Sequence, residues 1–161
     1  MMKAKSGFTL VEILIVVVIL GILAAIVIPQ FTEASTEAKL SSLCTDLQTL
    51  RSQIELFKVQ HNDVAPKLAT FLAQMTTYSD VDGNAQTAKD TTHIYGPYLQ
   101  KIPVNQFNDM KDALGNGLLV TMGAAASDAG SWAYDETTGA IRPDDTYDKN
   151  PADGTADHWN L

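Results

Sequence analysis

The sequence predicts an α+β fold in which a long N-terminal helix carries a small antiparallel sheet on its second half. Three patterns predict it. Residues 8–28 form an apolar run with two polar side chains, and about 20 apolar residues suffice to cross a bilayer as a helix. Apolar residues then recur at helical spacing between positions 40 and 57. Short β-branched and aromatic stretches follow between positions 117 and 142.

The composition argues against several classes of protein. The chain has 161 residues and a formal net charge of −8, which suits one domain with an extension. Removal of Lys3 and Lys5 would leave nine basic residues against 19 acidic ones, a charge of about −10. Nucleic-acid binding needs clusters of Lys and Arg, and none follows Lys5. Cys44 is the single cysteine, so the chain has no intramolecular disulfide and lacks the Cys/His spacings of a zinc site.

The N-terminal segment has three competing interpretations, of which two rest on general patterns. A cleaved secretory signal has an apolar core of roughly 7–15 residues before a small-x-small site. Here the run is longer, Gly7 precedes it, and residues 24–26 offer only a weak site. An uncleaved signal anchor explains the length and the two lysines, which favour a cytoplasmic N-terminus. It leaves Glu12 and Pro29 unexplained.

The third interpretation comes from resemblance. Residues 5–12, with the sequence Lys-Ser-Gly-Phe-Thr-Leu-Val-Glu, resemble the prepilin signature of type IV pilins and type II secretion pseudopilins. The similarity continues through Gly21 to Pro29. In that family a membrane peptidase cuts after the residue that matches Gly7 and methylates the new N-terminus, here Phe8. The resemblance implies that the apolar helices then pack side by side as the core of a helical filament.

Glu12 is the feature of the apolar run that an anchor does not need. An unpaired charge inside a membrane costs on the order of 3 kcal/mol or more. Cleavage would give Phe8 a charged α-amino group, which Glu12 of a neighbouring subunit, or of the same one, would neutralise. The alternative is a glutamate that reaches the lipid headgroups from one turn inside the membrane. We expect filament assembly to depend on Phe8 and Glu12.

Gly21 and Pro29 bracket a stretch of weakened helix. Pro29 cannot donate a backbone hydrogen bond and crowds the carbonyl of Ala25, and Gly21 is a weak helix former. The resemblance implies that this stretch loses helicity when subunits enter the filament, so both residues are assigned to assembly. A simple kink at the membrane exit is the alternative.

Residues 31–62 are expected to form the amphipathic second half of the helix. Apolar residues recur at spacings of three and four: Leu40, Leu43, Leu47, Leu50, Ile54 and Phe57. A sheet lying over this stripe explains it better than a short coiled coil. From Phe8 to Gln60 the helix would be about 80 Å long at 1.5 Å per residue. Cys44 lies beside the stripe, where we expect it to pack rather than react.

Residues 63–142 are expected to form a globular head. Pro66 is tolerated in a first helical turn and opens a short helix over residues 67–75. The polar residues 76–92 are predicted as a loop with a turn at 82–84. Two prolines argue against a regular element over residues 96–108. Three strands follow, at 117–122, 131–134 and 140–142, the last two joined by a hairpin loop at 135–139.

The head extends the resemblance to the G-type major pseudopilins and related short pilins. Residues 96–103 resemble the stretch that leads into their sheet, and residues 132–139 resemble their last hairpin. Residues 104–108 depart from the Asp-Pro-Trp-Gly-like run of many members. The cysteine pair that closes the C-terminal loop of many pilus-forming pilins is absent. This weighs against the major pilins that carry such a disulfide, but it does not exclude a surface pilus.

Residues 143–161 are expected to form an irregular acidic tail. G-type pseudopilins carry a calcium site in their C-terminal loops, and this tail offers five oxygen ligands: Asp144, Asp145, Asp148, Asn150 and Asp153. Their spacing does not fit the D-x-[DN]-x-[DN]-G loop, because Ala152 falls on a ligand position. A solvated tail is the alternative. We expect no required cofactor, with Ca²⁺ as the single candidate.

These observations predict a structural, non-enzymatic subunit, since no nucleophile and base gather around His61, His93 or His158. Residues 1–7 would be the leader and residues 8–30 the membrane and filament-core half of the helix. The precursor would sit in the inner membrane with its head in the periplasm. Two assemblies remain open, a periplasmic secretion pseudopilus and an extracellular type IV pilus for adhesion, motility or DNA uptake. A monomeric, membrane-anchored binding domain with an uncleaved anchor is the alternative.

The resemblance also implies a set of partners. These are further copies of the chain, the prepilin peptidase, an inner-membrane assembly platform, minor pilins or pseudopilins, and membrane lipid before assembly.

Overall fold

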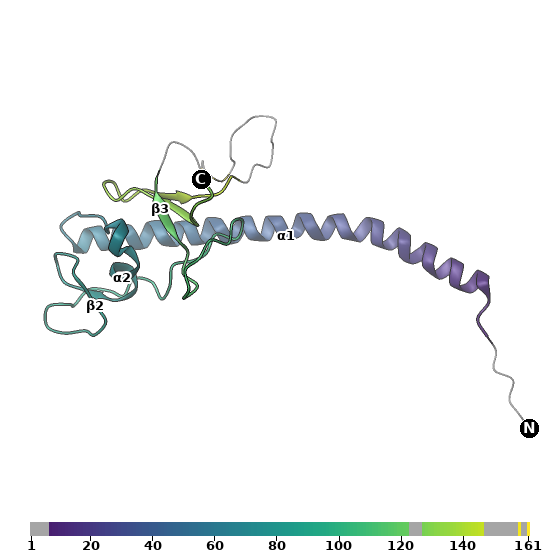
Figure 1. Cartoon of the computed structure of the whole chain (residues 1–161), viewed down its shortest axis with the longest axis horizontal. Coiled ribbons are helices and arrows are strands. Elements are labelled where there is room, and N and C mark those ends of the chain that lie inside the picture. Colours follow the sequence, from purple (N-terminus) through teal and green to yellow (C-terminus); the bar gives the residue numbers. More distant parts are fainter. Residues whose placement is uncertain (1–6, 123–126, 147–157, 159–160) are drawn as a thin grey trace, which may run out of the picture. The chain divides into compact units, whose positions relative to one another are not determined.

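A computed structural model describes residues 7–122, 127–146, 158 and 161, apart from the side chains of Pro29 and Thr32. The chain divides into two compact units, one that ends at Lys39 and one that begins at Leu40. The 51-residue helix α1, Leu10–Gln60, contributes to both units. Figure 1 shows it as one unbroken ribbon. The predicted helix from Phe8 to Gln60 is thus confirmed except for its first two residues.

The N-terminal unit consists, in its described part, of the first half of α1 and the three residues before it. The helix runs through Gly21 and Pro29 without a break. Nothing lies within 4 Å of a side-chain carbon placed on Gly21, so this glycine makes no close packing contact. In this chain, the weakened stretch between Gly21 and Pro29 is helical.

The core of the head begins with the predicted stripe on α1. Five of its six residues are fully or almost fully buried, from Leu43 to Phe57, and Leu40 packs at the edge. Burying one such side chain contributes roughly 1.5–3 kcal/mol. The stripe packs against side chains from the rest of the head: Phe71, Met75, Ile102, Trp132, Tyr134 and Ile141. The prediction that the head lies over this stripe is confirmed.

The short helix expected at 67–75 is present as a 3-10 turn, Leu68–Thr70, followed by α2, Phe71–Thr76. Phe71 and Met75 supply its buried apolar face. Gln74 is buried as well, because its side chain joins two loops. Its Oε1 accepts a hydrogen bond from the Lys67 amide at 2.8 Å, and its Nε2 donates to the Gly83 carbonyl at 2.8 Å.

Residues 76–92 were predicted to be a loop, and this is corrected in part. Strands β1, Tyr78–Ser79, and β2, Ala85–Gln86, pair antiparallel within it. The predicted turn lies between them, and Asp80 closes it. Its carboxylate accepts hydrogen bonds from the Asp82 and Asn84 amides and from the Asn84 side chain, at 2.8–3.0 Å. The turn therefore aligns two strands that are too short to show a pattern of alternation.

A second turn has the same sequence pattern, Asp-x-x-Gly-Asn. The Asp112 carboxylate accepts hydrogen bonds from the Leu114 and Asn116 amides and from the Asn116 side chain, at 2.8–3.0 Å. The glycine of each turn has a φ of +80°, a conformation that other residues rarely adopt. In both turns the hydrogen bonds from Asn lower the pKa of the aspartate, Asp80 or Asp112, from its usual value.

The main sheet contains the three predicted strands, β3, Leu119–Thr121, β4, Trp132–Tyr134, and β5, Ile141–Pro143, in the order β3-β4-β5. The pairing of β4 with β5 is antiparallel, as expected. The pairing of β3 with β4 is parallel, so the sheet is mixed rather than antiparallel throughout. Residues 131–134 read as alternating in the sequence, and the structure corrects this. All three residues of β4 are buried, as expected for a central strand covered on both faces.

The proline-containing segment 96–108 has no regular structure, as predicted, and is fixed to the core by hydrogen bonds. The Tyr98 and Leu99 amides both donate to the Met75 carbonyl at 2.9 Å. Ile102 and Asn105 are fully buried. The Trp132 indole Nε1 donates to the Pro103 carbonyl at 2.7 Å, which holds this segment against β4.

Candidate functional site

The peptide bond between Gly7 and Phe8 lies in the irregular residues just before α1 begins at Leu10. The Phe8 side chain is 83% exposed, and nothing lies within 4 Å of a side-chain carbon placed on Gly7. Among the described residues, nothing packs against this bond, so cleavage there would not require α1 to unfold.

Thr9 and Glu12 form a reciprocal cap at the start of α1. The Thr9 amide and hydroxyl both donate to Glu12 Oε2 at 3.0 Å. In return, the Glu12 amide donates to Thr9 Oγ1 at 3.2 Å. This is the capping box, in which the residue before the helix and the third helical residue satisfy each other's exposed amides. The Glu12 carboxylate therefore already has a partner in its own chain.

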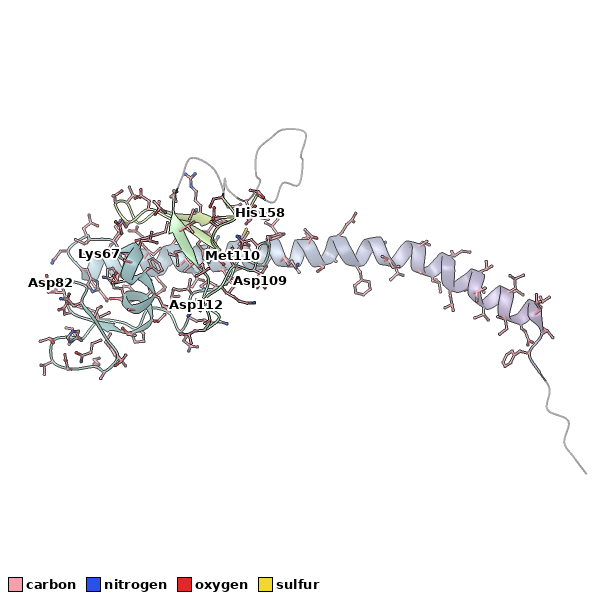
Figure 2. All side chains as sticks on the ribbon, viewed as in Figure 1. Lys67, Asp82, Asp109, Met110, Asp112 and His158 are labelled. Atoms are coloured by element: carbon pink, nitrogen blue, oxygen red, sulfur yellow. The ribbon has the colours of Figure 1, made fainter. Side chains whose placement is uncertain are left out.

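The surface of the first half of α1 is apolar on every side. Large apolar residues between positions 8 and 28 are exposed by 43–83%. Figure 2 shows side chains that project from this half of the helix in all directions. Within the described residues, α1 is the one helix long and apolar enough to span a membrane. A helix that is apolar all round requires burial, either in lipid or among other helices.

The residues predicted to act in processing and assembly follow one another along α1 and the residues before it, and they do not surround a pocket. Gly7, Phe8 and Glu12 fall within the first turn of α1 or just before it. Gly21 and Pro29 follow further along the same helix. The arrangement suits contacts made along the length of a helix, and it does not gather groups for chemistry at one point.

The carboxylates of the two described acidic residues of the tail, Asp144 and Asp145, make hydrogen bonds within the chain. The Asp144 carboxylate accepts hydrogen bonds from the Ser127 amide and hydroxyl and from the Ala129 and Gly130 amides, at 2.7–3.1 Å. Ca²⁺ takes six to eight oxygen ligands, and calcium binding by the tail stays a prediction. Asp148, Asn150 and Asp153 lie outside the described residues, and no metal-binding group of three appears among the residues that are described.

Asp145 is held by a second set of contacts. Its Oδ2 accepts a hydrogen bond from Asn105 Nδ2 at 2.5 Å, and its Oδ1 lies 2.8 Å from His158 Nδ1. Both aspartates are 1% exposed. The expectation of a solvated acidic tail is therefore wrong for these two residues, because protein donors replace the water around their carboxylates.

The histidines that the sequence left unassigned have structural partners. His61 is buried, stacks on Phe57 with ring centroids 3.7 Å apart, and bonds the Phe57 carbonyl and the Ser79 hydroxyl at 2.7 and 3.0 Å. His158, labelled in Figure 2, lies 2.8 Å from Asp145 and packs on the Phe107 ring. Cys44 is half-buried beside the stripe.

Comparison with known proteins gives one match to the N-terminal segment and further matches to most of the chain. The family described as the prokaryotic N-terminal methylation motif matches residues 2–28. The type II secretion system core protein G of Pseudomonas aeruginosa is 32% identical over 137 residues, which cover 80% of this chain and 90% of that protein. The protein of the same name from Aeromonas hydrophila is 28% identical over 71% of this chain and 76% of its own. No solved structure matches.

A relative with a different name also matches. A fimbrial protein of Pseudomonas aeruginosa is 30% identical over 95 residues, which cover 56% of this chain and 62% of that protein. The two names agree with the resemblance carried by residues 5–29, and the long helix with a small sheet agrees with the expected fold. The chain belongs to the pilin and pseudopilin family that includes the type II secretion system core protein G.

Proposed function

We propose that this chain is the subunit of a helical filament, made as a prepilin in the inner membrane, cleaved after Gly7 and methylated on the new amino group of Phe8. The observation that carries the proposal is the all-round apolar surface of residues 8–28, which the chain does not itself cover. Lipid covers that surface in the precursor, and the same helix of other copies covers it in the filament.

Glu12 gives a reason why the helix would leave the lipid and enter the filament. In the uncleaved chain its carboxylate caps α1 through Thr9. Cleavage adds a positive charge on Phe8, directly before this cap. Two opposite charges that meet in an apolar setting cost far less than two that remain apart, so pairing between subunits favours the filament over the separated state.

The lysines before the apolar run favour an orientation with the N-terminus in the cytoplasm and the head in the periplasm. From there the chain meets the prepilin peptidase, an inner-membrane assembly platform, minor pilins or pseudopilins, and other copies of itself. The role is structural and not enzymatic, and it requires no cofactor. Calcium remains a candidate ligand for the tail residues outside the described part.

Two assemblies fit this scheme. The longer match to core protein G supports a periplasmic pseudopilus of type II protein secretion. The match to a fimbrial protein supports a surface pilus as the second candidate. Electron microscopy of cells that express the chain separates the two, because a pilus extends beyond the outer membrane and a pseudopilus does not.

The processing step is tested with a Gly7 variant. Gly7→Val places a branched side chain beside the cleaved bond, at a position where it meets no other residue. We expect a precursor that inserts normally, keeps its leader, and is absent from sheared filaments. Gly21→Ala is the matched control for processing, since Gly21 is equally uncovered, and it should be cleaved. A cleaved and assembled Gly7→Val chain would contradict the proposal and favour another start for the mature protein.

A further inference from the structure

Asp46 and Arg51 lie on opposite flanks of the buried stripe of α1. The two residues are five positions apart, which places them about 140° apart around the helix axis and roughly 7.5 Å apart along it. Leu47 and Leu50, both buried in the core, lie between them. Each charged residue is half-buried at one edge of the surface that the head covers.

The Arg51 flank is a groove of about 420 Å³, lined by Arg51, Glu55, Arg142 and residues 138–141. Arg51 donates from Nη2 to the Ile141 carbonyl at 3.2 Å, which fixes its position beside β5. Burial, and then the positive charge of Arg142, lower the pKa of Arg51. Among the described residues that line the groove, Glu55 is acidic, and it pairs with Lys58 at 3.1 Å. Two arginines thus stand close together on a chain of net charge −8.

The Asp46 flank has the opposite charge. Within the described part of the chain, no hydrogen bond or ion pair reaches the Asp46 carboxylate, and burial raises its pKa. A half-buried carboxylate without a partner is costly, and the same carboxylate beside two arginines would be stabilised.

We propose that Asp46 of one copy docks into the Arg51–Arg142 groove of the next copy in the filament. Because the two flanks differ, the contact is head-to-tail, and its axial offset makes it continue as an open helix rather than close into a ring. This inference rests on the proposed function.

Cross-linking of the full-length chain in assembled filaments tests the contact. In a Cys44→Ser background, Asp46→Cys is combined with Arg142→Cys and treated with a short thiol-to-thiol cross-linker, because long paired side chains hold backbones further apart than a disulfide allows. We expect a ladder of covalent dimers, trimers and longer chains. The matched control combines Asp46→Cys with Leu114→Cys, a head residue that is 83% exposed but lies outside the groove, and should give no ladder.

Charge reversal gives an independent readout. Asp46→Arg and Arg142→Glu should each lower the filament yield at least fivefold, and the two changes together should restore most of it. Filaments that form normally but give no 46–142 ladder, or reversals without mutual rescue, would overturn the contact while the proposed function stands. A wild-type chain that forms no filament would instead overturn the proposed function.

Discussion

Thr9 and Glu12 cap the first turn of α1 reciprocally, with the Thr9 amide 3.0 Å from the Glu12 carboxylate and the Glu12 amide 3.2 Å from the Thr9 hydroxyl. Glu12 therefore performs a local task before any neighbouring subunit is present. Its hydrogen-bonding role and its charge can be separated by substitution, because an amide side chain still accepts the hydrogen bonds but carries no charge.

Glu12→Gln is predicted to insert and to be processed normally, yet to be lost from filaments by tenfold or more. The glutamine oxygen keeps the bond from the Thr9 amide, so the start of the helix is preserved, while the positive charge on Phe8 is left without its partner. Immunoblots of the sheared and membrane fractions measure the distribution. Thr9→Ala is the control, since it weakens the cap but keeps the charge, and it should still assemble. Equal filament yields for wild type and Glu12→Gln would remove the charge from the mechanism.

His61→Ala is predicted to destabilise the head by about 3 kcal/mol. The Phe57 carbonyl can only accept, so His61 Nδ1 carries the proton and Nε2 accepts from the Ser79 hydroxyl. The substitution removes the stack on Phe57 and the hydrogen bonds to the Phe57 carbonyl and the Ser79 hydroxyl. Urea unfolding of the full chain in detergent, followed by Trp fluorescence, measures the change. His93→Ala, in a loop outside the core, should change stability by less than about 1 kcal/mol; a similar loss for both variants would contradict this role of His61.

The two Asp-x-x-Gly-Asn turns are predicted to weaken in acid. Hydrogen bonds from Asn84 and Asn116 lower the pKa of Asp80 and Asp112, so the folded state binds the proton less readily than the unfolded state. The stability that these carboxylates contribute is fully present above about pH 4, their unfolded pKa, and is lost as the pH falls further. The difference in melting temperature between wild type and an Asp80→Ala, Asp112→Ala variant should shrink toward zero between neutral pH and low pH. A difference that grows in acid would contradict the assignment.

Asp144→Asn is predicted to cost the head about 3 kcal/mol, because the side chain keeps one acceptor oxygen and its amide nitrogen would face a backbone amide in either orientation, that of Ser127 or those of Ala129 and Gly130. Asp63→Asn is the control, since Asp63 is exposed and has a φ of +64°, a conformation that Asn tolerates.

Chelation of calcium should leave the melting temperature of the wild type unchanged if the described aspartates are satisfied by protein donors alone. Stabilisation by millimolar calcium that Asp144→Asn abolishes would show that Asp144 binds the cation.

The long helix and its buried stripe were predictable because each depends on a periodic pattern over many residues. The strands at 117–122, 131–134 and 140–142 were found from composition, but the parallel pairing of β3 with β4 was not. The direction of this pairing depends on which end of β3 the chain reaches before β4 begins at Trp132. No pattern in the sequence of either strand indicates that direction. The burial of Ala133 follows from the central place of β4 in the sheet, which its own sequence does not reveal.

The roles assigned to Gly7, Phe8, Glu12, Gly21 and Pro29 stay predictions. The Thr9–Glu12 cap was not predicted, but it was visible in the sequence, because Thr9-x-x-Glu12 matches the capping-box signature. The burial of Asp144 and Asp145 was not, because their donors come from residues 105, 127, 129, 130 and 158, which are distant in the chain. An acidic stretch alone does not distinguish solvated carboxylates from those that organise a loop.

Intact mass spectrometry of the chain in purified filaments tests the central claim most directly. Cleavage after Gly7 and methylation predict a polypeptide that begins at N-methylated Phe8, with no residue of the leader remaining. A chain that retains residues 1–7, or one found only as a monomer in the membrane, would contradict the account and support the uncleaved anchor.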